Sequence, residues 1–272
     1  MSSKQKAKKK KSKLSFLVSL FSSLIVFSVL FVFVVNPVLK QMELPYLSFL
    51  DFDLLTFAKE NNEDPQPNES TSNVSVTFAE FLDQTIFVGD SRTNGMKNFG
   101  FLPEENVFAI DGASHQLART ERFIVLEGSS RKLTIAQAVA ELKPVRLVVS
   151  FGINGVAYMG EETFLSEYSE FLDELKEASP NTSIVVQSIL PVSSSYARSD
   201  RRMANDIIDG YNAELRLLSN QKGCYFLDTS HVLKNEDGAL AAEYDSGDGL
   251  HFNKTAYTAL FDYLDQQHNE IP

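Results

Sequence analysis

The segment TIFVGDS, residues 85–91, joins a strand-like run to a turn that ends on a serine. Its first four residues are β-branched or apolar, as in a short buried strand, and the glycine that follows favours a sharp change of direction. A serine at the point where a strand turns into a helix is exposed at the edge of an α/β sheet, where serine nucleophiles occur. The segment therefore predicts an α/β domain and makes Ser91 a candidate nucleophile.

The rest of the body alternates strand-like and helix-like signals. Further apolar runs of strand length lie at residues 107–110, 146–150, 183–189 and 224–227. Helical patterns lie at residues 132–142, 161–178, 203–221 and 254–267. Strands that alternate with helices predict βαβ units and a parallel sheet covered on both faces. We therefore expect a three-layer α/β/α sandwich with a parallel sheet of about five strands.

A second polar motif, Asp248-Gly249-Leu250-His251, lies near the C-terminus. A serine hydroxyl is a poor nucleophile until an imidazole accepts its proton, and a carboxylate must orient that imidazole. His251 is thus the candidate general base and Asp248 its acidic partner, with Asp245 as the fallback acid. The same residues are also typical of a glycine-rich turn before a helix.

Two more polar segments follow predicted strands. Gly112 comes after the run at 107–110, and Asn154 comes after the run at 146–150. Both should emerge at the carboxyl edge of the sheet, where open α/β sheets bind their ligands. Each could equally be an ordinary turn residue, since glycine and asparagine both tolerate the left-handed conformation.

These four ordered blocks resemble the SGNH (GDSL-type) hydrolase superfamily, from about Phe78 to the C-terminus. The resemblance implies a flavodoxin-like fold and a serine esterase that needs no cofactor. It implies that Gly112 and Asn154 bind the oxyanion, together with the backbone N–H of Ser91. Two positions depart from the family pattern: Arg92 replaces a common leucine, and Gly155 replaces a common aspartate.

The remaining polar residues have weaker functional signals. Arg92 could bind an anionic group or a sugar hydroxyl of the substrate, or lie on the solvent face of a helix. His115 is expected in a surface loop, although it could line the pocket, and His231 could compete as general base. His268 is expected to be solvated. The spacing of the histidines matches no metal site, so we expect neither a metal nor another cofactor.

The N-terminus has the pattern of a membrane anchor. Residues 1–13 contain seven lysines, and residues 14–35 form an uncharged stretch of 22 residues. At 1.5 Å per residue this stretch measures about 33 Å, enough to cross a hydrocarbon core of about 30 Å. The lysines predict a cytoplasmic tail at 1–13, a signal anchor at 14–35 and an extracytoplasmic remainder. Residues 36–77 should form a juxtamembrane segment and polar linker, and residues 78–272 the hydrolase domain.

Charge and cysteine content narrow the class of protein. The formal net charge is −11, and it becomes −18 when the seven N-terminal lysines are left out. Such an acidic body argues against a nucleic-acid partner. The single cysteine, Cys224, excludes an intramolecular disulfide and is expected to be a small buried residue.

The sequence thus predicts a membrane-anchored, extracytoplasmic, bacterial serine esterase. Its substrate should be an O-acylated, most simply O-acetylated, carbohydrate of the cell wall or surface, or another small ester. Three alternatives stay open at this point. They are an O-acyltransferase that uses the same triad, a non-catalytic wall-binding module, and an enzyme that hydrolyses lipid acyl chains.

Overall fold

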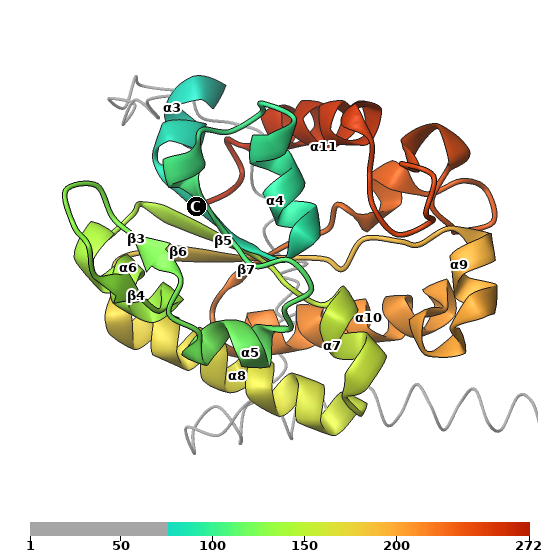
Figure 1. Ribbon diagram of the computed structural model, residues 1–272, viewed down its shortest axis with the longest axis horizontal. Coiled ribbons are helices and arrows are strands. Elements are labelled where there is room, and N and C mark those ends of the chain that lie inside the picture. The colour runs from blue at the N-terminus through green and yellow to red at the C-terminus, as the bar shows by residue number, and fades with distance from the viewer. Residues whose placement is uncertain (1–75) are drawn as a thin grey trace, which may run out of the picture. The chain divides into compact units, whose positions relative to one another are not determined.

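The computed structural model describes residues 76–272 and is built on a five-stranded parallel sheet with helices on both faces (Figure 1). The strands lie in the order β2-β1-β5-β6-β7. Their bounds are Thr85–Gly89 for β1, Val107–Ala109 for β2, Arg146–Ser150 for β5, Ser183–Gln187 for β6 and Tyr225–Leu227 for β7. Each lies within or next to a predicted strand, and the expected α/β/α sandwich is confirmed.

Successive residues of the strands point to opposite faces of the sheet. Ile86 and Val88 of β1 belong to one buried cluster, whereas Phe87 between them belongs to the other. In β5 the same alternation separates Leu147 and Val149 from Val148. Because both faces are buried, the strands read as continuous apolar runs, as parallel sheets do.

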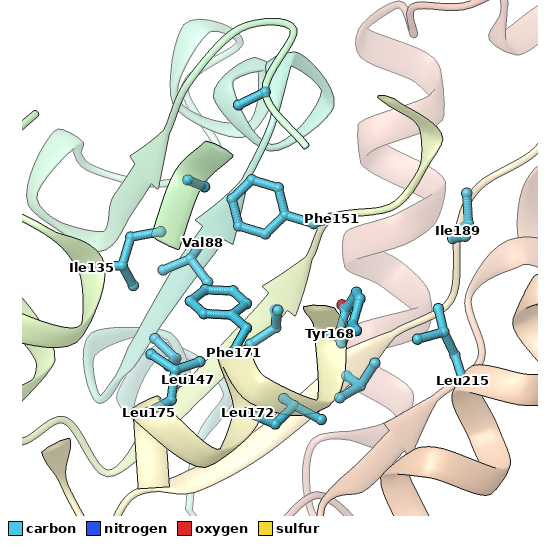
Figure 2. Close-up of a cluster of buried hydrophobic side chains, with 14 of the residues drawn as sticks. Val88, Ile135, Leu147, Phe151, Tyr168, Phe171, Leu172, Leu175, Ile189 and Leu215 are labelled. Carbon is cyan, nitrogen blue, oxygen red and sulfur yellow. The ribbon is translucent and has the colours of Figure 1, made fainter. Parts of the chain in front are cut away.

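Helices cover the two faces separately. One face carries α5 (His115–Thr120), α6 (Ile135–Leu142), α7 (Ile153–Tyr158), α8 (Glu161–Ala178) and α10 (Asn205–Gln221). The other carries α3 (Phe78–Asp83), α4 (Ser91–Asn98) and α11 (Lys254–Gln267). Figure 2 shows Phe171 and Leu175 of α8 beside Val88 and Leu147 of the sheet, and Tyr168 and Leu172 of the same helix belong to the same buried cluster. Burial of each such side chain stabilises the fold by about 1.5–3 kcal/mol.

The predicted helix at residues 132–142 is wrong at its start. Lys132–Leu133 form a short strand, β4, which pairs antiparallel with β3 (Ile124–Val125) in a separate two-stranded sheet. The helix begins only at Ile135, where Thr134 accepts a hydrogen bond from the N–H of Gln137 in a capping box. Short elements were also missed, namely α9 (Ser194–Ser199) and the 3₁₀ turns at Glu104–Asn106, Arg201–Met203, Ser230–Leu233 and Ala242–Tyr244.

The order of the strands places a crevice after β1. From β1 the chain moves first to β2 on one side and later to β5 on the other, so β1 lies at the topological switch point. Gly89 at the end of β1 is level with Ala109 of β2 and Ser150 of β5. Loops that follow these three strands therefore meet at one edge, where ligands bind in open α/β sheets.

Within residues 76–272, no helix is both long enough and apolar enough to cross a membrane. The predicted cytoplasmic tail at 1–13, the signal anchor at 14–35 and all but the last two residues of the segment 36–77 lie outside the described residues.

Candidate active site

Ser91 is the first residue of α4, and only Asp90 separates it from the end of β1. Asp90 caps the helix, because its side chain accepts a hydrogen bond from the N–H of Arg92 at 3.0 Å. Gly89 must lack a side chain, since a Cβ there would lie 1.9 Å from Oγ1 of Thr93 and 3.0 Å from the carbonyl oxygen of Ser150. The residues Gly-Asp-Ser thus have local structural reasons to occur together, and they leave the serine at the mouth of the crevice.

A continuous hydrogen-bonded chain runs from Ser91 through His251 to Asp248. Oγ of Ser91 lies 3.0 Å from Nε2 of His251, and Nδ1 of His251 lies 2.6 Å from Oδ2 of Asp248. This order of groups lets the imidazole accept the hydroxyl proton at one nitrogen while the carboxylate holds the other nitrogen protonated. The arrangement can therefore generate a serine nucleophile.

The carboxylate of Asp248 is fixed by its own loop. Oδ1 accepts the N–H of Leu250 at 2.8 Å and that of His251 at 2.7 Å. Partial burial raises the pKa of Asp248, but the hydrogen bonds from His251 and Leu250 outweigh it and lower the pKa to about 2. The side chains of Asp248 and His251 are 52% and 42% exposed, so water can reach the pair.

Asp90 is a buried carboxyl group beside the nucleophile that the sequence reasoning did not select. Its Oδ2 accepts a hydrogen bond from Nδ2 of Asn154 at 3.1 Å, and the residue is 1% exposed. Burial raises the pKa of Asp90 to about 6, although the charges of Arg92 and His251 act in the opposite direction. The sequence feature that could have indicated a role for Asp90 is its position directly before Ser91 in the Gly-Asp-Ser motif.

The two predicted oxyanion residues follow strands that end at this edge: Gly112 lies in the turn after β2, and Asn154 lies in the first turn of α7 after β5. Gly112 has φ of +74° in the turn after β2, and its N–H has no hydrogen-bond partner among residues 76–272. The N–H of Ser91 is likewise unpaired within this part of the chain. Asn154 differs, because its amide nitrogen also donates to the carbonyl oxygen of Ala113 at 3.1 Å. An oxyanion would have to replace one of its two acceptors.

Arg92 lies neither on the solvent face of a helix nor in an open substrate site. It is 6% exposed, and its guanidinium donates to the backbone carbonyl oxygens of Leu190, Pro191 and Leu250. Both sequence hypotheses for this residue assumed an accessible side chain. The side chain instead turns inward because three carbonyl groups from distant parts of the chain converge on it.

None of the other three histidines, all of which lie within residues 76–272, hydrogen-bonds to Ser91, whose hydroxyl contacts His251. The expected surface position of His115 is wrong: the side chain is fully buried against Phe164 and Tyr168, and burial lowers its pKa to about 4. His231 lies 3.9 Å from Asp228 and is exposed. His268 is half-buried, with its ring tilted against that of Phe78 and edge-on to that of Phe81, and is not solvated as expected.

The two remaining expectations concern Asp245 and Cys224. The fallback acid does not contact His251, because Oδ1 of Asp245 accepts the N–H groups of Gly247 and Gly249 at 2.8 and 2.9 Å. Cys224 is buried, as expected, and burial raises the pKa of its thiol.

Solved structures with the same fold come from several bacteria. A protein of Bacteroides fragilis described as an acylhydrolase is 16% identical, with a TM-score of 0.53 over 75% of this chain and 99% of that one. A GDSL-like lipase from Bacteroides thetaiotaomicron is 17% identical, with a TM-score of 0.51 over 68% of this chain and 87% of that one. A protein from Streptococcus pneumonia, described as a platelet activating factor, is 19% identical, with a TM-score of 0.52 over 68% and 83%.

These identities are low, so the structural likeness shows the fold alone. Comparison with curated proteins finds no match. The decisive finding is a match to the GDSL-like Lipase/Acylhydrolase family over residues 87–259, which runs from β1 into α11 and takes in every block of the site described above. The chain belongs to the GDSL-like lipase/acylhydrolase family and is a serine hydrolase of the esterase class.

Proposed function

We propose that this protein is a membrane-anchored, extracytoplasmic esterase that removes O-acetyl groups from cell-wall or surface carbohydrate with a Ser91-His251-Asp248 triad. The observation that carries the proposal is the hydrogen-bonded chain of these three side chains at the carboxyl edge of the sheet. The proposal assigns residues 1–13 to the cytoplasm, 14–35 to the membrane, 36–77 to a linker and 78–272 to the esterase domain.

The geometry supports a two-step reaction. His251 accepts the proton of Ser91 as Oγ attacks the ester carbonyl carbon, and Asp248 stabilises the imidazolium that forms. The N–H groups of Ser91 and Gly112 face the negative charge that develops on the carbonyl oxygen, and Asn154 joins them by exchanging the Ala113 carbonyl for this oxygen. His251 then protonates the leaving sugar hydroxyl, so that an acyl-enzyme remains on Ser91.

Hydrolysis rather than acyl transfer is favoured by the exposure of the site. A transferase must keep water away from the acyl-enzyme until the acceptor hydroxyl arrives. Here the side chains of His251 and Asp248 are about half exposed. A water molecule can therefore approach the imidazole, lose its proton to it and release the acid from Ser91.

The acyl group and its carrier are inferred from the expected location of the domain. The predicted anchor and the acidic body point to a carbohydrate outside the cytoplasmic membrane as the carrier of the acyl group.

The test uses the full-length protein in mild detergent with p-nitrophenyl acetate, butyrate and octanoate. We expect the acetate to be hydrolysed fastest, and Ser91→Ala to lose activity by a factor of about 10³ or more. Ser166→Ala is the matched control, because Ser166 is exposed on α8, and it should keep wild-type activity. Equal activity of Ser91→Ala and wild type would exclude the triad.

Carrier, acceptor and location need separate measurements. O-acetylated wall glycan incubated with the enzyme should release acetate, whereas acetyl found on an added glycan would indicate a transferase. A preference for octanoate would indicate a lipid substrate. Protease added to spheroplasts should digest the domain at 78–272; protection of this domain would contradict the proposed topology.

A further inference from the structure

Arg92 joins three segments of the chain at the active site. Its Nε donates to the carbonyl oxygen of Leu250 at 3.1 Å, Nη1 to that of Leu190 at 2.7 Å and Nη2 to that of Pro191 at 3.2 Å. The guanidinium also lies over the ring of Phe252, 4.7 Å from its centroid. One buried side chain thus connects the start of α4, the loop after β6 and the loop that carries His251.

The burial of this charge is energetically costly. Desolvation lowers the pKa of Arg92 to about 10, while the nearby charge of Asp90 acts against this change. The group therefore stays protonated at neutral pH, in surroundings where an unpaired charge would be strongly disfavoured. A leucine of similar volume would avoid this penalty. What an apolar side chain cannot supply is directional contact with three carbonyl groups.

The contacts of Arg92 run beside the proposed catalytic contact. Arg92 follows Ser91 in sequence, and its partner Leu250 precedes His251. The bond from Arg92 to Leu250 therefore joins the immediate neighbours of the two residues whose side chains meet at 3.0 Å. On the other side, the hydroxyl of Tyr257 in α11 donates to the carbonyl oxygen of Arg92 at 2.7 Å.

We propose that Arg92 is a positioning residue that sets the approach of His251 to Ser91 by holding the backbones of the His251 loop and of the Leu190–Pro191 segment. This inference rests on the proposed triad. Arg92 acts through these backbones and does not touch the substrate, because its donors face protein carbonyl groups. Lysine is a poor substitute, since a single ammonium group cannot reproduce the planar fork that reaches three acceptors.

The test compares Arg92→Leu and Arg92→Lys with wild type in full-length protein, using p-nitrophenyl acetate. A misplacement of about 1 Å between reacting groups can lower the rate about 10²-fold. We therefore expect kcat of Arg92→Leu to fall about 10²-fold with KM unchanged. The kcat of Arg92→Lys should lie between that of wild type and that of Arg92→Leu. Arg92→Lys keeps the charge and one contact, so it reports on positioning if the leucine variant does not fold.

Arg146→Leu is the matched control. Arg146 is also buried, at 8% exposed, and its guanidinium lies 4.5 Å from the centroid of the Phe81 ring. It is the first residue of β5, however, and so lies at the amino end of the strands, whereas the candidate site lies at their carboxyl end. Its Nε and Nη1 have no hydrogen-bond partner among residues 76–272. We expect Arg146→Leu to change the melting temperature and to leave kcat at the wild-type value.

A double variant separates positioning from other roles. In a His251→Ala background, Arg92→Leu should cause no further loss of kcat, because the group that Arg92 positions is absent. A further loss of about 10²-fold would overturn the inference, as would a rise in KM with kcat intact, or an unchanged kcat in Arg92→Leu. Wild-type activity of His251→Ala alone would instead refute the proposed triad and leave the inference without its basis.

Discussion

Asp90 makes the stability of the domain depend on pH in a direction opposite to that of most carboxyl groups. Burial raises its pKa from 3.8 to about 6. The folded state therefore binds the proton of Asp90 more tightly than the unfolded state does. The stability associated with this group is fully present below about pH 4 and is lost as the pH rises through about 6.

The magnitude follows from the two pKa values. A pKa difference of one corresponds to about 1.4 kcal/mol, so the rise from 3.8 to about 6 is worth about 3 kcal/mol. Asp90→Asn replaces the carboxyl group with an amide, which does not titrate. The unfolding free energy of wild type relative to Asp90→Asn should therefore fall by about 2–3 kcal/mol between about pH 4 and about pH 7. Urea denaturation of both proteins at several pH values measures this difference.

Two carboxyl groups serve as references for this measurement. Asp111 is exposed in the turn after β2. The unfolding free energy of Asp111→Asn, measured relative to Asp90→Asn, should therefore fall with rising pH as that of wild type does. The pKa of Asp248 is lowered to about 2, so its contribution is present above about pH 4 and is lost only below that range. Parallel stability curves for wild type and Asp90→Asn would refute the reasoning about Asp90.

Three further substitutions test other parts of the structure. Asn154→Ala should lower kcat for p-nitrophenyl acetate about 10²-fold, or about 3 kcal/mol, and an unchanged kcat would remove Asn154 from the oxyanion site. Gly249→Ala should lower both kcat and the melting temperature, because Gly249 has φ of +78° and its new Cβ would lie 2.3 Å from Oγ of Ser193. Leu172→Ala should lower the free energy of unfolding by about 2–5 kcal/mol in chemical denaturation and leave KM unchanged. A smaller loss would mean that the side chains around Leu172 in Figure 2 move to fill the space that the substitution leaves.

The sequence predicts the sheet well because its signal is local. The strands β1, β5 and β6 are buried on both faces, and this burial requires an apolar run that can be read within five or six residues. The helix α8 was predicted with its observed bounds, Glu161–Ala178, because it is long and its apolar residues recur at helical spacing. The strand β4 could not be found this way, because two residues show no periodicity.

The surroundings of Arg92 and His115 could not be predicted, because they depend on contacts between distant segments. The carbonyl groups that Arg92 contacts lie 98, 99 and 158 residues further along the chain. His115 is covered by α8, and its Nε2 donates a hydrogen bond at 3.1 Å to the carbonyl oxygen of Phe164, which lies 49 positions further along the chain. A polar residue in a predicted loop is normally placed in solvent, and only the tertiary structure overrides this expectation.

The choice of His251 among the histidines also has a tertiary origin. An aspartate stands three residues before each of three histidines, at Asp228/His231, Asp248/His251 and Asp265/His268. The spacing brings acid and imidazole together each time, so it cannot identify the general base. What distinguishes His251 is a loop that returns to the switch point after β1 and reaches a serine 160 residues earlier in the chain.

That loop owes its shape to Asp245. Oδ1 of Asp245 accepts the N–H groups of Gly247 and Gly249, and its backbone pairs with Phe252 in an isolated antiparallel bridge. These contacts fold the segment back on itself and present His251 at its end, where the N–H of Ser246 also donates to the carbonyl oxygen of His251 at 3.0 Å. The residue that the sequence suggested as a substitute acid therefore has a different task. Asp245 stabilises the loop that carries His251, whereas Asp248 hydrogen-bonds to the imidazole and orients it.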